Sequence, residues 1–277
     1  AGASVTTGTI NTLIGGLAGD ALTSGNSNVA LGYVSLSADT LGDRAVALGY
    51  GALNQQNFAT STDNFNVGVG YSAGLSITTG IHNVIVGGTA GDALTDADYN
   101  TVLGSNALSA DTLGSLSTAV GFNALATQNF TTATNTYNVA VGASAGLNVT
   151  TGNLNTFVGG LSGDAITTGT DNVAVGYAAL SGEDAHGLNV AVGSQALRVQ
   201  NAGANAYNVA VGYNAGGATT TGTGNTLIGG LTGDALTEGN SNVAMGYLAL
   251  SADTLGDRAV AIGLNSLATQ NFATSTD

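Results

Sequence analysis

The 277-residue sequence contains no cysteine, no proline and no tryptophan, and only 7% of its residues are charged. The absence of cysteine excludes disulfides and thiolate metal sites and leaves the redox compartment open. Positive charge is almost absent too: three arginines and no lysine face 17 acidic residues, for a net charge of −14. Such a surface repels phosphate backbones and anionic lipid, so we expect no nucleic-acid partner. No apolar run approaches the roughly 18 residues of a membrane span, so we expect no membrane insertion.

Low charge does not mean that the chain is unstructured. Disordered segments combine polarity with few apolar residues. Here 43% of the residues are hydrophobic, and they recur at regular places. The composition therefore predicts an ordered chain.

A five-residue motif, Asn-(Thr/Val)-x-aliphatic-Gly, opens fifteen successive units, from residues 11–15 to residues 259–263, with alanine or serine in place of the asparagine in three of them. Eleven of the fourteen intervals between the motif glycines are 17 residues, two are 21 and one is 19. A fixed period this short predicts one solenoid coil per unit, each burying its apolar face on the next coil. No stretch keeps the 3.6-residue spacing of an amphipathic helix. The prediction is an all-β, parallel β-solenoid.

A second, longer period groups the coils in fours, because the intervals of 21 and 19 residues recur at every fourth coil. It divides residues 1–277, which we interpret as a single solenoid segment, into super-repeats of about 72 residues: 11–82, 83–154, 155–224 and an incomplete 225–277. Both ends of the sequence fall inside a repeat. We therefore interpret the chain as part of a longer protein.

Within each coil we number the residues from the motif asparagine, position 1, so that the motif glycine is position 5. Alternation along a short strand leads us to expect positions 2 and 4 on the buried face. Position 3 would then form a second apolar face. If the chain forms a trimer, this face would pack around the three-fold axis. Glycine at position 5, beginning with Gly15, Gly32 and Gly49, permits a positive φ and a tight corner. Position 3 is usually small and enlarges once per super-repeat, which predicts plugs along that axis, at Leu13, Ile85, Phe157 and Leu227.

Asparagine occupies position 1 in twelve coils. Stacked one coil above another, these amides would form a ladder of hydrogen bonds inside the corner. We predict a structural role for all twelve: Asn11, Asn28, Asn66, Asn83, Asn100, Asn138, Asn155, Asn172, Asn189, Asn208, Asn225 and Asn242.

Residues that could carry catalysis are few. His82 and His186 occupy non-equivalent positions, and neither has the spacing of a base held by a third group. We interpret both as surface-loop histidines, and Glu183-Asp184 as a solvated turn. A grooved solenoid enzyme would need acidic and basic residues converging on one face. The sequence therefore predicts no enzyme, no catalytic residue and no cofactor.

A weak metal signal remains at one aspartate of each super-repeat. The phrase Gly-Gly-Leu-Ala-Gly-Asp at residues 15–20 partly resembles the calcium-binding nonapeptide, but it occurs once per four coils. Calcium rolls hold each ion between neighbouring coils. We interpret the four aspartates as turn formers and keep weak cation binding as an alternative: Asp20, Asp92, Asp164 and Asp234.

Aromatic residues recur directly after the motif glycine. A row of exposed rings can stack on sugars, or it can pack on the next coil or on a neighbouring subunit. We favour packing and leave glycan binding open for Tyr33, Tyr50, Tyr71, Phe122, Tyr177, Tyr213 and Tyr247.

The phrase Asn-Val-Ala-Val-Gly-Tyr, with Thr-Thr-Gly turns and a 17-residue period, resembles the repeats of phage tail fibres and of trimeric autotransporter adhesin heads. The adhesin motif is usually Asn-Ser-Val-Ala-Ile-Gly with a shorter period. The resemblance implies a left-handed β-roll, a homotrimeric fibre, and a shaft that extends a tip binding a host-surface glycan or protein. It also implies a location outside the cell or on a virion. Neither the heptads of adhesin stalks nor a C-terminal chaperone module is present in this sequence.

Two other functions stay open. A self-assembling extracellular filament or surface-layer protein would use the super-repeat as its lattice unit. A monomeric ice-binding solenoid would need a threonine array, but threonine pairs recur mainly once per super-repeat, at residues 6–7, 78–79, 150–151 and 219–220.

Overall fold

The computed structural model describes residues 1–272 and residue 274, which form strands and turns without a helix. The chain is a parallel β-solenoid of about fifteen coils with about 17 residues per coil, which confirms the predicted all-β, parallel solenoid. Its contacts define two compact units, Ala1–Asn138 and Val139–Asp277. Each unit repeats the same coil.

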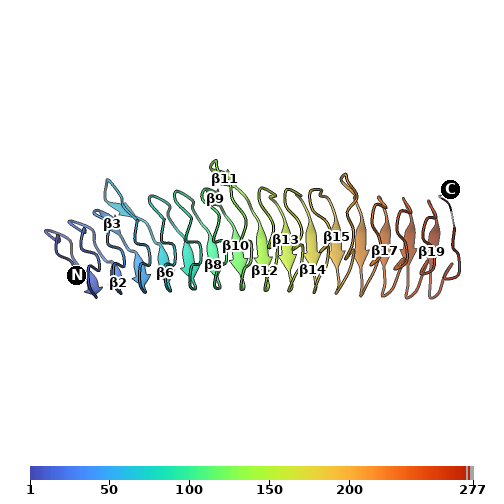
Figure 1. Ribbon diagram of the computed structural model, residues 1–277, viewed down its shortest axis with the longest axis horizontal. Helices are drawn as coiled ribbons and strands as arrows, with labels where there is room; N and C mark the ends of the chain where they lie inside the picture. The colour runs from blue at the N-terminus through green and yellow to red at the C-terminus, as the bar shows by residue number, and fades with distance from the viewer. Residues whose placement is uncertain (273, 275–277) are drawn as a thin grey trace. The chain divides into compact units, whose positions relative to one another are not determined.

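In unit 1, one three-residue strand from each coil joins a parallel sheet whose order follows the chain (Figure 1). Each of the two long coils of this unit adds a short strand that pairs with the end of the coil before it: β5 (Thr62–Asp63) with β3 (Gly42–Asp43), and β11 (Thr134–Asn135) with β9 (Gly114–Ser115). The main-sheet strands are β1 (Thr12–Ile14), β2 (Val29–Leu31), β4 (Val46–Leu48), β6 (Val67–Val69), β7 (Val84–Val86), β8 (Thr101–Leu103) and β10 (Thr118–Val120).

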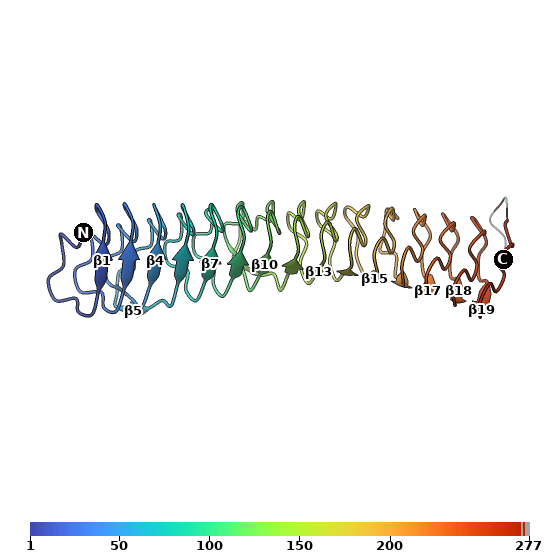
Figure 2. The same ribbon diagram turned by 90° about the horizontal axis from the view of Figure 1, so that it is seen from below.

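Unit 2 repeats this arrangement with eight strands, again parallel and in chain order (Figure 2). Equivalent residues pair across each step, as in Phe157 with Ala174 and Ala174 with Ala191. Its strands are β12 (Val139–Val141), β13 (Thr156–Val158), β14 (Val173–Val175), β15 (Val190–Val192), β16 (Val209–Val211), β17 (Thr226–Ile228), β18 (Val243–Met245) and β19 (Val260–Ile262).

The strands turn the opposite face inward from the one predicted. Position 3 is the inner position: Ile85, Phe157 and Leu227 are completely buried, and Leu13 is half-buried. Positions 2 and 4 are half-buried or exposed in every strand. The predicted axis plugs are therefore wrong, because these four side chains fill the interior of their own coils.

The interior is filled by three positions that change together. Where position 9 is leucine, as in Leu36 and Leu53, position 12 is polar, as in Asp39 and Gln56. Where position 9 is glycine, position 12 is usually aliphatic. A Cβ on Gly163 would lie 2.4 Å from a ring carbon of Phe157, so the glycine makes room for the large side chain. Core volume is thus shared among positions 3, 9 and 12, as close packing requires.

The leucines at position 9 reach the interior from an unusual backbone conformation. Leu36, Leu53 and Leu108 have φ between 47° and 49° and are fully buried. A left-handed residue with a side chain costs about 1–2 kcal/mol. Burying a leucine gains about 1.5–3 kcal/mol, which offsets that strain.

The predicted asparagine ladder is present and almost wholly buried. Its bonds run mainly from side chain to backbone. Asn28 Oδ1 accepts the backbone N–H of Ala45 (2.8 Å), and Asn28 Nδ2 donates to the carbonyl of Gly42 (2.8 Å). Each amide therefore satisfies an acceptor at position 15 of its own coil and a donor at position 1 of the next coil, at a corner closed to water.

Candidate functional site

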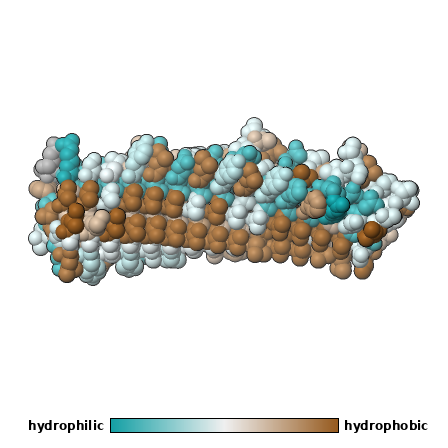
Figure 3. Space-filling model, turned by 180° about the vertical axis from the view of Figure 1, so that it is seen from behind, coloured by the Kyte–Doolittle hydropathy of each residue, from teal (hydrophilic) through white to brown (hydrophobic). Residues whose placement is uncertain are grey.

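The outward side of the strands is the most extensive candidate surface. Positions 2 and 4, which we call the outer strand face, carry valine, isoleucine, leucine, methionine or threonine in every strand. Side chains along it are up to 64% exposed, as in Ile262, and position 4 is aliphatic throughout. Figure 3 shows apolar residues forming a continuous stripe along one face of each unit. The outer strand face is thus an unpartnered apolar surface.

Two aromatic stacks lie on the surface of unit 1. The rings of Tyr33, Tyr50 and Tyr71, at position 6 of three successive coils, lie 5.6 and 5.2 Å apart between centroids. Stacking at this spacing is worth about 0.5–1.5 kcal/mol per pair. In unit 2, Tyr177 is exposed, but the neighbouring coils carry Gly160 and Ser194 at position 6. The structure therefore brings only some of the predicted tyrosines together, and glycan binding stays a prediction.

The second stack runs along the last residue of three successive coils. Phe65, His82 and Tyr99 lie 5.1 and 5.0 Å apart between ring centroids. The guanidinium of Arg44 lies 5.4 Å from the centroid of Phe65, and Arg44 also pairs with Asp63. His82 is therefore a half-buried residue of the loop between β6 and β7, and its ring is packed between those of Phe65 and Tyr99.

A buried carboxylate network recurs at position 12. Asp39 Oδ1 accepts the backbone N–H of Gly42 (3.0 Å), and Asp39 Oδ2 accepts a bond from Gln56 (2.7 Å). Gln56 in turn accepts a bond from Asn66, which links the network to the asparagine ladder. Burial raises the pKa of Asp39, although its hydrogen bonds oppose the shift. Asp111 and Gln128 repeat the arrangement four coils later.

The four candidate calcium aspartates are not brought together. Each lies at position 10, and the coils beside Asp92 carry Leu75 and Ser109 there. Three of them have one buried carboxylate oxygen without a hydrogen-bond partner: Asp92, Asp164 and Asp234. Burial raises the pKa of each of these three carboxyls. Single carboxylates four coils apart do not form a calcium roll.

These raised pKa values predict that mild acid stabilises the protein. The pKa of each carboxyl is higher in the folded state than its ordinary value of 3.8, so the folded state binds the proton more tightly than the unfolded state. This contribution to the free energy of unfolding is fully present below pH 3.8 and is lost as the pH rises through the folded-state pKa. We expect the Tm to be highest near pH 4 and to fall as the pH rises through the folded-state pKa of these groups. The measurement is thermal unfolding followed by circular dichroism.

The matched variant carries Asp92→Asn, Asp164→Asn and Asp234→Asn, which remove three of the titrating groups at nearly constant shape. Its Tm is expected to change less with pH than that of the unmodified chain. An equal slope in both proteins would show that these aspartates do not cause the effect.

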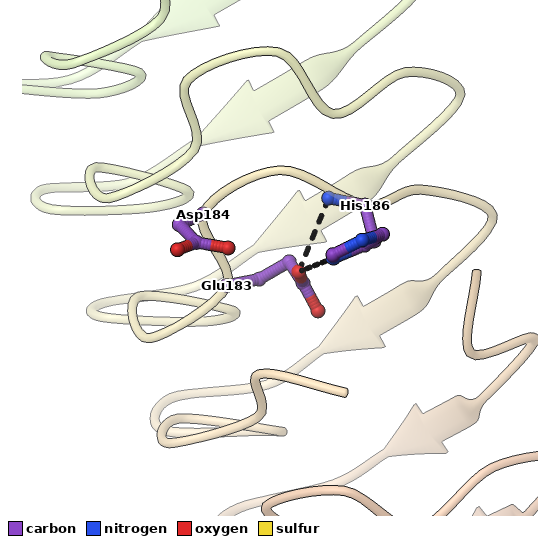
Figure 4. Close-up of side chains that lie close together, drawn as sticks. All are labelled: Glu183, Asp184 and His186. Carbon is purple, nitrogen blue, oxygen red and sulfur yellow. Dashed lines mark hydrogen bonds and ion pairs between the residues drawn. The ribbon is translucent and has the colours of Figure 1, made fainter. Parts of the chain in front are cut away.

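One coil of unit 2 places three metal-ligating residue types together (Figure 4). Glu183 is completely buried, and its Oε1 accepts the backbone N–H of His186 (3.2 Å) and lies 3.4 Å from His186 Nδ1. Asp184 is exposed. One ligand atom from each of the three lies within 4.8 Å of the others, and no second group of this kind occurs among residues 1–272. The predicted solvated turn is right for Asp184 and wrong for Glu183.

Polar atoms in this coil are incompletely satisfied. Neither Glu183 Oε2 nor His186 Nδ1 has a hydrogen-bond partner, although both atoms are buried. Burial raises the pKa of Glu183 against the opposing effect of the His186 backbone bond. Sequence reasoning missed this cluster because it considered the histidine and the acidic pair separately.

Threonine forms a denser column than the predicted pairs indicated. Position 13 is threonine in ten coils, and the hydroxyls of Thr23, Thr95 and Thr237 donate to the carbonyl of the next threonine. These donors are used between coils, so the column does not present a row of free hydroxyl donors.

Comparison with known proteins yields no match to any protein family, curated protein or solved structure. Over the described residues there is no pocket, and no helix of the length and hydrophobicity needed to cross a membrane.

Proposed function

We propose that this chain is a structural, non-enzymatic segment of an extracellular or virion-surface fibre or adhesin. In this proposal three copies of a left-handed solenoid form a homotrimeric shaft. The shaft extends a tip that binds a glycan or protein on a host surface.

The observation that supports this function is the outer strand face. Soluble monomers rarely expose contiguous apolar patches of more than a few hundred Å². Here half-buried or exposed apolar side chains recur on every coil, and Leu31, Leu103 and Met245 are among the exposed ones. Each Å² that a partner covers gains roughly 25 cal/mol. A second and a third copy offer the same face with the same repeat.

Geometry favours identical partners. Coils recur about every 4.8 Å along the sheet, so two copies can match their outer strand faces coil by coil. In the proposed trimer, three such faces pack against one another around an axis parallel to the stack. The proposed axis therefore lies against positions 2 and 4, and not against position 3.

Light scattering of the purified chain, together with negative-stain images, tests the proposal. We expect three times the 26.8 kDa of one chain. Charges placed on the outer strand face, Val158→Lys with Met245→Lys, are expected to give a monomer. The matched control places two lysines on exposed loop residues, Asn201→Lys with Thr221→Lys, and is expected to remain trimeric.

Each other outcome counts against the trimer or against the outer strand face as its interface. A monomer from the unmodified chain would contradict it, and thermal hysteresis from that monomer would support ice binding. Filaments that grow end to end would support the extracellular polymer. A trimer that survives the two face lysines would show that a different surface holds it together.

A further inference from the structure

The coil that contains residues 181–186 differs from its counterparts in the other super-repeats at positions 12, 13 and 15. The equivalent segments at residues 37–42, 109–114 and 251–256 all read Ser-Ala-Asp-Thr-Leu-Gly. Residues 181–186 read Ser-Gly-Glu-Asp-Ala-His. Glu183 replaces the aspartate, Asp184 the threonine and His186 the glycine. All three of these replacements are residues that bind metal ions.

The buried carboxylate in this coil has also lost the partners of its counterparts. Asp39 accepts bonds from Gln56 and from two backbone N–H groups. Gln200, the counterpart of Gln56, donates instead to Asn189 (3.0 Å). Glu183 Oε2 is left buried without a hydrogen-bond partner. Such a group costs about 1–3 kcal/mol or more, since the carboxylate is stripped of water.

We propose that Glu183, Asp184 and His186 bind one divalent transition-metal ion of the Zn²⁺ class. One imidazole and two carboxylates are ligands that Zn²⁺ accepts, and catalytic or open zinc sites often use three protein ligands plus water. Ca²⁺ prefers six to eight oxygen ligands, which this loop does not offer.

The present distances are close to those that a zinc site needs. Ligand atoms about 2.0–2.2 Å from a tetrahedral ion lie roughly 3.3–3.6 Å from one another. His186 Nδ1 and Glu183 Oε1 are already 3.4 Å apart. The widest separation in the cluster is 4.8 Å, and the exposed Asp184 side chain can close it by rotating. The same exposed side admits water to the fourth position.

Isothermal titration of a tag-free chain with ZnCl₂ at pH 7 tests the site. We expect one ion per chain with a micromolar Kd. The control variant, Glu183→Asp with Asp184→Thr and His186→Gly, restores the residues of the three equivalent coils and is expected to bind at least tenfold more weakly. His186→Gln provides a second variant with a smaller change in backbone freedom. The Tm of each variant in EDTA establishes that it is folded.

Imidazole NMR provides an independent measurement, because the chain has two histidines. Zinc is expected to shift the resonances of His186 and to leave those of His82 unchanged. Absence of stoichiometric binding, equal binding by the restored coil, or equal competition by CaCl₂ would each overturn the proposal. Binding at scattered surface carboxylates would produce the last two results.

Discussion

Replacing Gly159 with alanine is expected to lower the Tm by roughly 6–12 °C, whereas the same change at the adjacent Gly160 leaves it unchanged. Gly159 has φ of +131°, a region essentially closed to residues with a Cβ. An added Cβ would also lie 2.6 Å from the carbonyl oxygen of Gly176 in the next coil. Strain and steric overlap together predict a loss of about 3 kcal/mol or more.

Gly160 is a control of the same residue type one peptide bond away. The atoms nearest to a Cβ there lie at 3.8 Å, which is ordinary contact. Other coils carry tyrosine, serine or alanine at this position. Thermal unfolding of the two variants side by side makes the comparison. Equal Tm values would mean that the corner adjusts and that stacking does not require glycine at position 5.

Asn225→Ala is expected to destabilise the protein by about 2–6 kcal/mol. Asn225 Oδ1 accepts the backbone N–H of Asn242 (2.9 Å), and Asn225 Nδ2 donates to the carbonyl of Gly239 (2.8 Å). Alanine leaves both backbone groups buried without these partners, at about 1–3 kcal/mol each. Urea unfolding measures the change in the free energy of unfolding.

The matched change, Asn201→Ala, removes an exposed amide and is expected to alter stability by less than about 0.5 kcal/mol. A coil that already has alanine at position 1 shows how the loss is compensated. Next to Ala45, Asn64 Oδ1 accepts the backbone N–H of Asn66 (2.9 Å). Similar stability of the Asn225 and Asn201 variants would show that water or another group replaces the ladder bonds.

The period of the sequence was sufficient to predict the solenoid, the asparagine ladder and the corner glycine. It was not sufficient to predict which side of the strand faces inward. Alternation separates positions 2 and 4 from position 3 without saying which set is buried. A small alanine at position 3, such as Ala47, does not by itself indicate a core position. The structure shows that Ala47 is buried and that Leu53, at position 9, is buried in the same coil. Nothing in a leucine side chain indicates that its backbone will have a positive φ.

The cluster at Glu183, Asp184 and His186 could have been found by aligning the super-repeats residue by residue. The three changes stand out only against Asp39, Thr40 and Gly42 and their later equivalents. The geometry could not be predicted in that way. That Glu183 is buried follows from position 12 facing inward, which the motif alone does not reveal.

The linked changes at positions 3, 9 and 12 set a rule for how such a chain can change in length. Removing a single coil would place Asp39 beside an aliphatic residue in place of Gln56, and a buried carboxylate would lose its donor. Removing or duplicating four coils together keeps an acidic residue beside a glutamine at position 12. Duplication or loss of about 72 residues at a time is therefore the step that preserves the interior, and the length of such a solenoid is expected to vary in increments of about 19 Å.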